Sequence, residues 1–185
     1  QVKDTWDVNM DMTSTFTCGY GYIKWRNVTK EDELSASGDA YTSIDFPLFR
    51  TADAYLMAAE AILRGASGTK SEALGYVNEV RTRAYMSGKY AKNGVRSDVS
   101  GEIGANELDL DFLLLERQKE LASELIRRTD LIRFGKYTKG NNWDWKNGVR
   151  LGEDVDDKYN LFPIPESELT NNPTLVQNDG YKVIK

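Results

Sequence analysis

Two amphipathic helical patterns, joined by a short glycine-containing turn, decide what this chain can fold into. Between residues 49 and 64 apolar side chains recur three and four positions apart, and the same spacing returns over residues 69–85. Thr69 and Glu72 have the spacing of a capping box at the start of the second pattern. We therefore expect an antiparallel helical hairpin at the centre of the fold.

The remaining sequence adds two helices after this hairpin and irregular segments at the two ends of the chain. Further helices are expected over residues 109–125 and 127–137, continuous or kinked because no strong breaker separates them. Residues 1–48 are polar and aromatic without a helical period, whereas residues 138–185 are rich in Asn, Gly, Asp and Pro and predict a long ordered loop. The expected fold is a single, mainly α-helical domain with tetratricopeptide-like helical pairs over residues 49–137 and long irregular loops.

The composition removes several classes of function. The chain contains no histidine, which excludes catalytic triads built on imidazole and histidine-ligated zinc. Its net charge of −5 argues against a protein that binds nucleic acid or an anionic membrane. The single Cys18 cannot form an intrachain disulfide, and no apolar run approaches the ~20 residues needed to span a bilayer.

Three glutamates lie four residues apart on one face of the third expected helix, and several arginines lie near them. Two of these carboxylates could act as the acid and base of a glycoside hydrolase. The alternative is a buried lattice of ion pairs that locks the third helix to the fourth, because like charges four residues apart repel unless cations separate them. We favour the lattice, whose expected members are Glu116, Arg117, Glu120, Glu124, Arg127, Asp130 and Arg133.

An acidic segment near the C-terminus is a weaker candidate for a functional site. Glu153, Asp154, Asp156 and Asp157 lie close together in sequence with Asn160. The spacing of a calcium-binding EF-hand loop, with its central glycine and final glutamate, is absent. We expect a solvated loop, no metal site and no cofactor.

Aromatic residues gather in the two irregular segments rather than on the helices. Sugar rings dock their apolar faces on exposed aromatic planes while neighbouring polar side chains bond the hydroxyls, so aromatic residues in loops rich in Asn and Asp suit a carbohydrate ligand. Each ring could instead anchor its loop to the helical core. The candidate carbohydrate-binding residues are Trp6, Tyr20, Tyr22, Trp25, Trp143 and Trp145.

Four segments, in the same order along the chain, resemble the conserved blocks of the SusD/RagB family. They are DFPLFRTADAYLMAAEA at residues 45–61, ALGYVNEVRTRA at residues 73–84, LERQKEL followed by RRTDLIRFGK within residues 115–136, and LFPIPESEL with the later NP and QNDGY within residues 161–181. One departure is Leu125-Ile126, where the family usually has Gly-His.

This resemblance implies a lipid-anchored protein at the cell-surface face of the outer membrane. Such a protein binds oligosaccharides without catalysis and covers a SusC-like TonB-dependent transporter barrel that imports them in polysaccharide utilization. The chain resembles the C-terminal part of the family, and Cys18 does not read as the lipid-bearing residue because no apolar export segment precedes it. The alternatives are a helical-repeat scaffold that binds a protein partner and a carboxylate-dependent glycoside hydrolase.

The matched blocks belong to the scaffold of the family, so no ligand-binding residue transfers with them. Trp143-Asp144-Trp145-Lys146 resembles a recurring W-x-W-K segment of one subgroup, which favours packing roles for its two tryptophans. Under this resemblance the better ligand candidates are the four aromatic residues near the N-terminus, Trp6, Tyr20, Tyr22 and Trp25.

Overall fold

The computed structural model describes residues 44–86, 100–140 and 143–182, together with residues 24, 25, 27, 28 and 33. The chain divides into two compact units, residues 1–46 and residues 47–185. In the first unit the indole of Trp25 stacks on the ring of Phe46, with centroids 5.5 Å apart and planes inclined by 17°.

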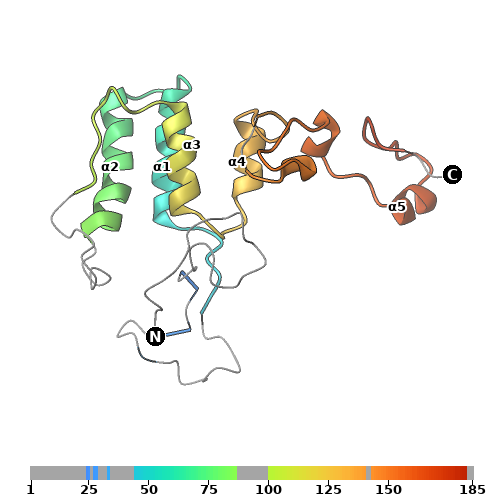
Figure 1. The fold of residues 1–185 in the computed structure, drawn as a ribbon, viewed down its shortest axis with the longest axis horizontal. Helices are drawn as coiled ribbons and strands as arrows, with labels where there is room; N and C mark the ends of the chain where they lie inside the picture. Colours follow the sequence, from blue (N-terminus) through green and yellow to red (C-terminus); the bar gives the residue numbers. More distant parts are fainter. Residues whose placement is uncertain are drawn as a thin grey trace. The chain divides into compact units, whose positions relative to one another are not determined.

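The second unit is helical, and the prediction of a mainly α-helical fold is confirmed (Figure 1). No strand occurs among the described residues, and none of their helices is long and apolar enough to cross a membrane. The elements are α1 (Thr51–Leu63), α2 (Lys70–Met86), α3 (Leu110–Glu120), α4 (Arg127–Arg133), the 3-10 turns η2 (Lys146–Gly148) and η3 (Asp157–Asn160), and α5 (Glu166–Asn171).

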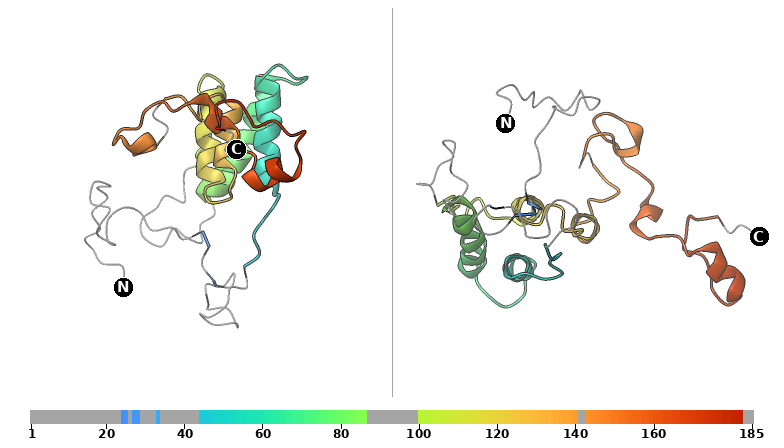
Figure 2. Two further views of the ribbon diagram at one scale, coloured as in Figure 1. Left: turned by 90° about the vertical axis from the view of Figure 1, so that its right-hand side faces the viewer. Right: turned by 90° about the horizontal axis from the view of Figure 1, so that it is seen from below.

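The hydrophobic core lies between α1, α2 and α3. Helix α1 packs against α2 on one side and against α3 on another, and α4 continues the row beyond α3. Figure 1 shows this order, and the right-hand view of Figure 2 shows α1, α3 and α4 end-on. The buried apolar side chains of this core are Leu56, Ala59, Ala73, Val77, Val80, Leu108 and Leu113.

Local chemistry fixes the turn between α1 and α2 as the sequence predicted. Gly65 has a φ of 99° and ends α1, and the amide of Ala66 donates to the carbonyl of Ala61. The capping box of α2 is confirmed: the Glu72 amide donates to the Thr69 hydroxyl at 3.2 Å, and the Glu72 carboxylate accepts from the Thr69 amide at 2.6 Å.

The expected helix over residues 109–125 ends at Glu120, and the prediction was wrong about its last turn. The carbonyl of Glu120, at the end of α3, accepts from the guanidinium of Arg50 at 2.6 Å. Ser123 and Leu125 both have a φ of 61°, in the left-handed region that interrupts a right-handed helix. The third and fourth helices are therefore separate elements.

The helix expected over residues 127–137 is also shorter, because α4 ends at Arg133. Gly135 has a φ of 68°, and the amide of Lys136 donates to the carbonyl of Leu131. The segment expected to be a loop, residues 138–185, carries the 3-10 turns η2 and η3 and the short helix α5 among its described residues.

Candidate functional site

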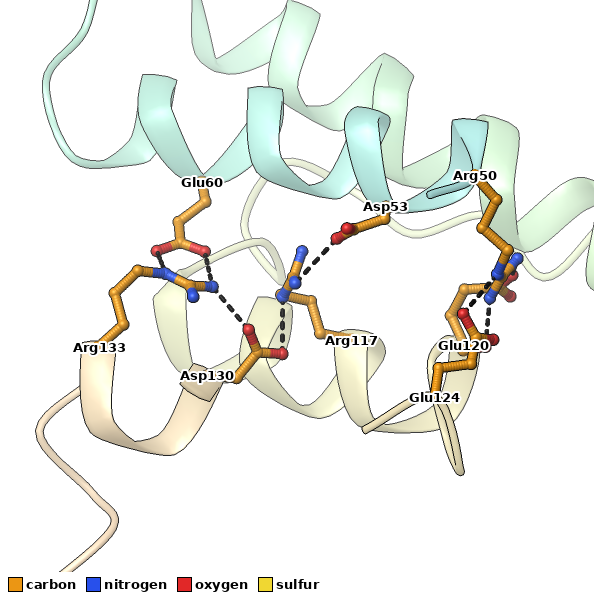
Figure 3. Close-up of polar contacts among 8 residues, drawn as sticks. All are labelled: Arg50, Asp53, Glu60, Arg117, Glu120, Glu124, Asp130 and Arg133. Carbon is orange, nitrogen blue, oxygen red and sulfur yellow. Dashed lines mark hydrogen bonds and ion pairs between the residues drawn. The ribbon is translucent and has the colours of Figure 1, made fainter. Parts of the chain in front are cut away.

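A network of ion pairs joins α1, α3 and α4 in the interior of the second unit (Figure 3). Its centre is Arg117 of α3, whose side chain is only 2% exposed. The Arg117 Nε donates to an Asp130 carboxylate oxygen at 2.8 Å, and its Nη2 lies 2.9 Å from a carboxylate oxygen of Asp53. One guanidinium therefore links the first helix to the fourth through the third.

A second arginine, at the C-terminal end of α4, connects α4 to α1 directly. Arg133 binds Glu60 of α1 with two hydrogen bonds of 2.8 Å and donates to Asp130 at 2.7 Å. Burial raises the pKa of Glu60, but hydrogen bonds from Arg133 and Arg64 outweigh it, so the pKa of this carboxyl is lowered overall. Glu60 is thus held as a carboxylate.

Arginines bind all three glutamates of the third expected helix, Glu116, Glu120 and Glu124. Glu116 accepts from Arg81 at 2.6 Å. Glu120 accepts from Arg50 at 2.6 Å, and the same arginine donates to Glu124 at 2.7 Å. All three carboxylates are therefore members of the ion-pair network.

The network differs from the expected lattice in two respects. It ties α3 to α1 as well as to α4, through residues that the sequence analysis did not include: Arg50, Asp53 and Glu60. Arg127 donates to the carbonyl of Leu114 at 2.9 Å instead of meeting a carboxylate, and burial lowers its pKa, with Asp130 partly offsetting the effect.

Two of the aromatic candidates, Trp143 and Trp145, lie in a loop after α4 whose ends are joined by hydrogen bonds. This loop (residues 137–140 and 143–157) is here named the tryptophan loop. Lys146 is its buried centre, with 1% of its surface exposed. The ammonium of Lys146 donates to the carbonyl of Gly140 at 2.9 Å and lies 5.1 Å from the ring centroid of Trp143. A cation–π contact and a hydrogen bond therefore hold the loop from inside.

The acidic residues near this lysine close the loop rather than form a separate site. The Asp154 carboxylate accepts from the amide of Gly140 at 2.7 Å, and Glu153 accepts from the side-chain amide of Asn147 at 2.7 Å. Asp157 accepts from the hydroxyl of Thr138, a hydrogen bond that lowers its pKa. Among the described residues no group of His, Cys, Asp or Glu side chains could hold a metal ion.

The two tryptophans of this loop have different environments. Trp143 packs at a tilt on Tyr137, with ring centroids 5.8 Å apart, and is 41% exposed. Trp145 is 60% exposed and has a φ of 63°. A left-handed backbone is uncommon for a bulky residue and costs about 1–3 kcal/mol, which the surrounding contacts must offset.

Trp145 therefore combines an exposed indole with a locally constrained backbone. Its amide donates to the carbonyl of Arg150 at 3.1 Å, which fixes the backbone under the exposed indole. The sequence analysis included Trp145 among its candidates, but no sequence signal distinguished its exposed ring from the packed ring of Trp143.

The other candidates fall in the N-terminal unit. Trp25 is half-buried against Phe46, with the ammonium of Lys24 5.9 Å from its ring centroid. Trp6, Tyr20 and Tyr22 lie outside the described residues, so their role in binding stays a prediction.

Comparison with known proteins gives a consistent match along nearly the whole chain. The model of the SusD family matches residues 2–181. The chain is 38% identical over 176 residues to the starch-binding protein SusD of Bacteroides thetaiotaomicron, an alignment that covers 95% of this chain and 28% of that protein.

Two relatives from Formosa agariphila match in the same way. The SusD-like protein P2 is 30% identical over 151 residues, which cover 80% of this chain and 28% of the relative. The SusD-like protein P25 is 33% identical over 141 residues, which cover 72% of this chain and 23% of the relative. The chain thus spans less than a third of the length of these relatives.

Proposed function

Since this chain belongs to the SusD family, we propose that it is part of a protein that binds glycans at the cell surface without cleaving them. The observation that carries the proposal is the exposed indole of Trp145 on a constrained backbone, in a loop rich in polar side chains. Stacking of a sugar face on such a ring, with hydroxyls bonded by neighbouring polar groups, gives micromolar to millimolar affinity without any catalytic group.

Trp145 is the primary stacking surface in this proposal, and Trp143 is its support. Trp143 lies between Tyr137 and the ammonium of Lys146, so its main role is to hold the loop. Trp25, Trp6, Tyr20 and Tyr22 remain proposed contacts of the N-terminal unit.

The proposal extends to the setting of the whole protein. A SusC-like TonB-dependent transporter is the proposed partner, and the cell-surface face of the outer membrane, reached through a lipid anchor, is the proposed location. Because one relative carries the name starch-binding protein, soluble starch is the first glycan to test. The tryptophan loop carries five acidic and three basic residues, and this negative balance favours neutral glycans over anionic ones.

Affinity electrophoresis of the purified chain through gels that contain soluble starch, a mannan or a polyuronate tests this function. We expect retardation by at least one neutral polysaccharide, no release of reducing ends, and loss of retardation in Trp145→Ala. The matched control is Tyr85→Ala, which removes an aromatic ring that is 45% exposed on α2. Retardation that survives Trp145→Ala would remove the proposed site, and release of reducing ends would favour a hydrolase.

A further inference from the structure

Lys146 is a buried cation whose ammonium forms no ion pair with the described residues. Only 1% of its surface is exposed, and the ammonium donates to the carbonyl of Gly140 and lies over the ring of Trp143. Removal of an ammonium from water is costly, and a single carbonyl and a single ring offset that cost only in part. The burial of this charge therefore points to a role other than stability.

The residues on either side of Lys146 have a backbone conformation that is uncommon outside glycine. Trp145 has a φ of 63° and Asn147 has a φ of 58°, both in the left-handed region. Asparagine tolerates this region, whereas a bulky residue such as tryptophan keeps it only where surrounding contacts determine the conformation. Lys146 lies between the two and is the buried residue of η2, so its side chain anchors this turn to the rest of the loop.

Hydrogen bonds hold the same turn on both sides of Lys146. The ammonium binds the carbonyl of Gly140 at 2.9 Å, and the amide of Gly140 donates to Asp154 at 2.7 Å. The amide of Trp145 donates to the carbonyl of Arg150 at 3.1 Å. The backbone of Trp145 is thus held by its own amide and by the side chain of the residue that follows it.

We propose that Lys146 is the positioning residue of the glycan site: its ammonium holds the turn in the conformation in which Trp145 stacks on a sugar. This inference rests on the proposed function of Trp145 and adds the residue that controls affinity. Lys146 is buried and does not touch the glycan, so it acts through the backbone of Trp145. When its charge is lost, the turn returns Trp145 to an ordinary φ, and the indole leaves its binding position.

Lys146→Met tests this role, because methionine keeps an unbranched side chain that packs on aromatic rings but donates no hydrogen bond. Gly140 is exposed, so its carbonyl can bind water in the variant. Affinity electrophoresis gives the dissociation constant for the neutral polysaccharide that retards the unsubstituted chain, and we expect this constant to rise about tenfold or more. The Tm should fall by less than about 3 °C, since removal of a buried charge offsets the loss of its contacts.

Hydrogen exchange reports the conformation of the turn without a ligand. The amide of Trp145 is protected by its bond to Arg150 and should exchange about tenfold faster in Lys146→Met, while amides of α1, α2 and α3 do not change. The matched control is Lys139→Met in the same loop, where the lysine side chain is 54% exposed and its ammonium lies 3.2 Å from Asp157. This control should leave the dissociation constant within about twofold of the unsubstituted value.

Three results would overturn this inference alone, provided that Trp145→Ala loses binding. They are a Lys146→Met variant that binds as tightly as the unsubstituted chain, unchanged exchange of the Trp145 amide in that variant, and a fall in its Tm larger than about 3 °C, which would assign Lys146 to stability. Binding that survives Trp145→Ala would instead remove the proposed glycan site, and the role of Lys146 with it.

Discussion

Leu125 shows how a single backbone angle can be read from structure but not from sequence. Its φ of 61° places it in the left-handed region, and its side chain is 86% exposed. The SusD/RagB pattern usually has glycine at this point, and glycine adopts this conformation without strain. Leucine there therefore carries strain that no packing of its side chain offsets.

Leu125→Gly is expected to stabilise the protein by about 0.5–1 kcal/mol, because relief of the left-handed strain exceeds the extra entropy of glycine in the unfolded chain. Equilibrium unfolding in urea measures the change. The control is Leu115→Gly within α3, where the same substitution should destabilise by about 1 kcal/mol. A loss of stability in Leu125→Gly would show that leucine is not strained at this position.

Arg117 is expected to be the most sensitive charged residue of the frame. Arg117→Met leaves the buried Asp53 carboxylate without its arginine and Asp130 with Arg133 alone, and should destabilise by about 3–5 kcal/mol. Arg83→Ala is the matched control: Arg83 is 56% exposed and its partner Glu120 keeps Arg50, so the expected loss is below about 1 kcal/mol. Similar losses in the two variants, measured by thermal and urea unfolding, would contradict the assigned role of Arg117.

Glu60 makes stability depend on pH in a defined direction. Its pKa in the folded state lies below the ordinary value of 4.5, so its contribution is fully present above pH 4.5 and is lost as the pH falls through the lower folded value. Unfolding free energies at pH 7, 4.5 and 3 should therefore fall on acidification, and Glu60→Gln should make the fall below pH 4.5 less steep. An unchanged slope in Glu60→Gln would show that this carboxyl does not contribute.

At the scale of elements, the sequence predicts that the helices exist but predicts only some of the residues at which they end. The apolar spacing of α1 and α2 and the capping box at Thr69 are local signals, and the structure follows them. The end of α3 depends on a contact with Arg50, 70 residues away in sequence, which no local pattern contains. The turns of the C-terminal segment likewise depend on tertiary contacts.

Arg128 links α4 to the described C-terminal segment. Its guanidinium lies 5.0 Å from the ring centroid of Tyr137 and 4.1 Å from that of Phe162, and it donates to the carbonyls of Tyr159 and Asn160 at 2.9 and 3.2 Å. We expect Arg128→Ala to release the segment after Tyr159 while α1, α2 and α3 keep their stability.

Hydrogen exchange measured by mass spectrometry tests this link. Amides of residues 159–181 should exchange faster in Arg128→Ala, and those of the core helices should not change. Arg128→Lys should behave like the alanine variant to a large extent, since lysine lacks the planar group that stacks on both rings. Unchanged exchange over this segment in both variants would show that other contacts hold it.

At the scale of the whole molecule, the scaffold and the candidate site differ in how far the sequence predicts them. The scaffold rests on periodic apolar residues and on arginine–carboxylate pairs, whose residue types are visible in the sequence. The site rests on which ring faces outward. Trp143 and Trp145 are two residues apart and of the same residue type, so the sequence does not show which ring is more exposed. The structure distinguishes them by the buried Lys146 and by the left-handed backbone at Trp145.

The central proposal is that the exposed indole of Trp145 stacks on a glycan while α1, α2 and α3 serve as the scaffold. Its most direct test is a titration of the 15N-labelled chain with soluble starch oligosaccharides, or with the neutral glycan that binds best, followed through the indole N–H resonances of its four tryptophans. The account predicts that the Trp145 resonance shifts with saturation while amides of α1, α2 and α3 stay in place. A Trp145 resonance that does not move while the glycan binds, or shifts spread through the core helices, would contradict it.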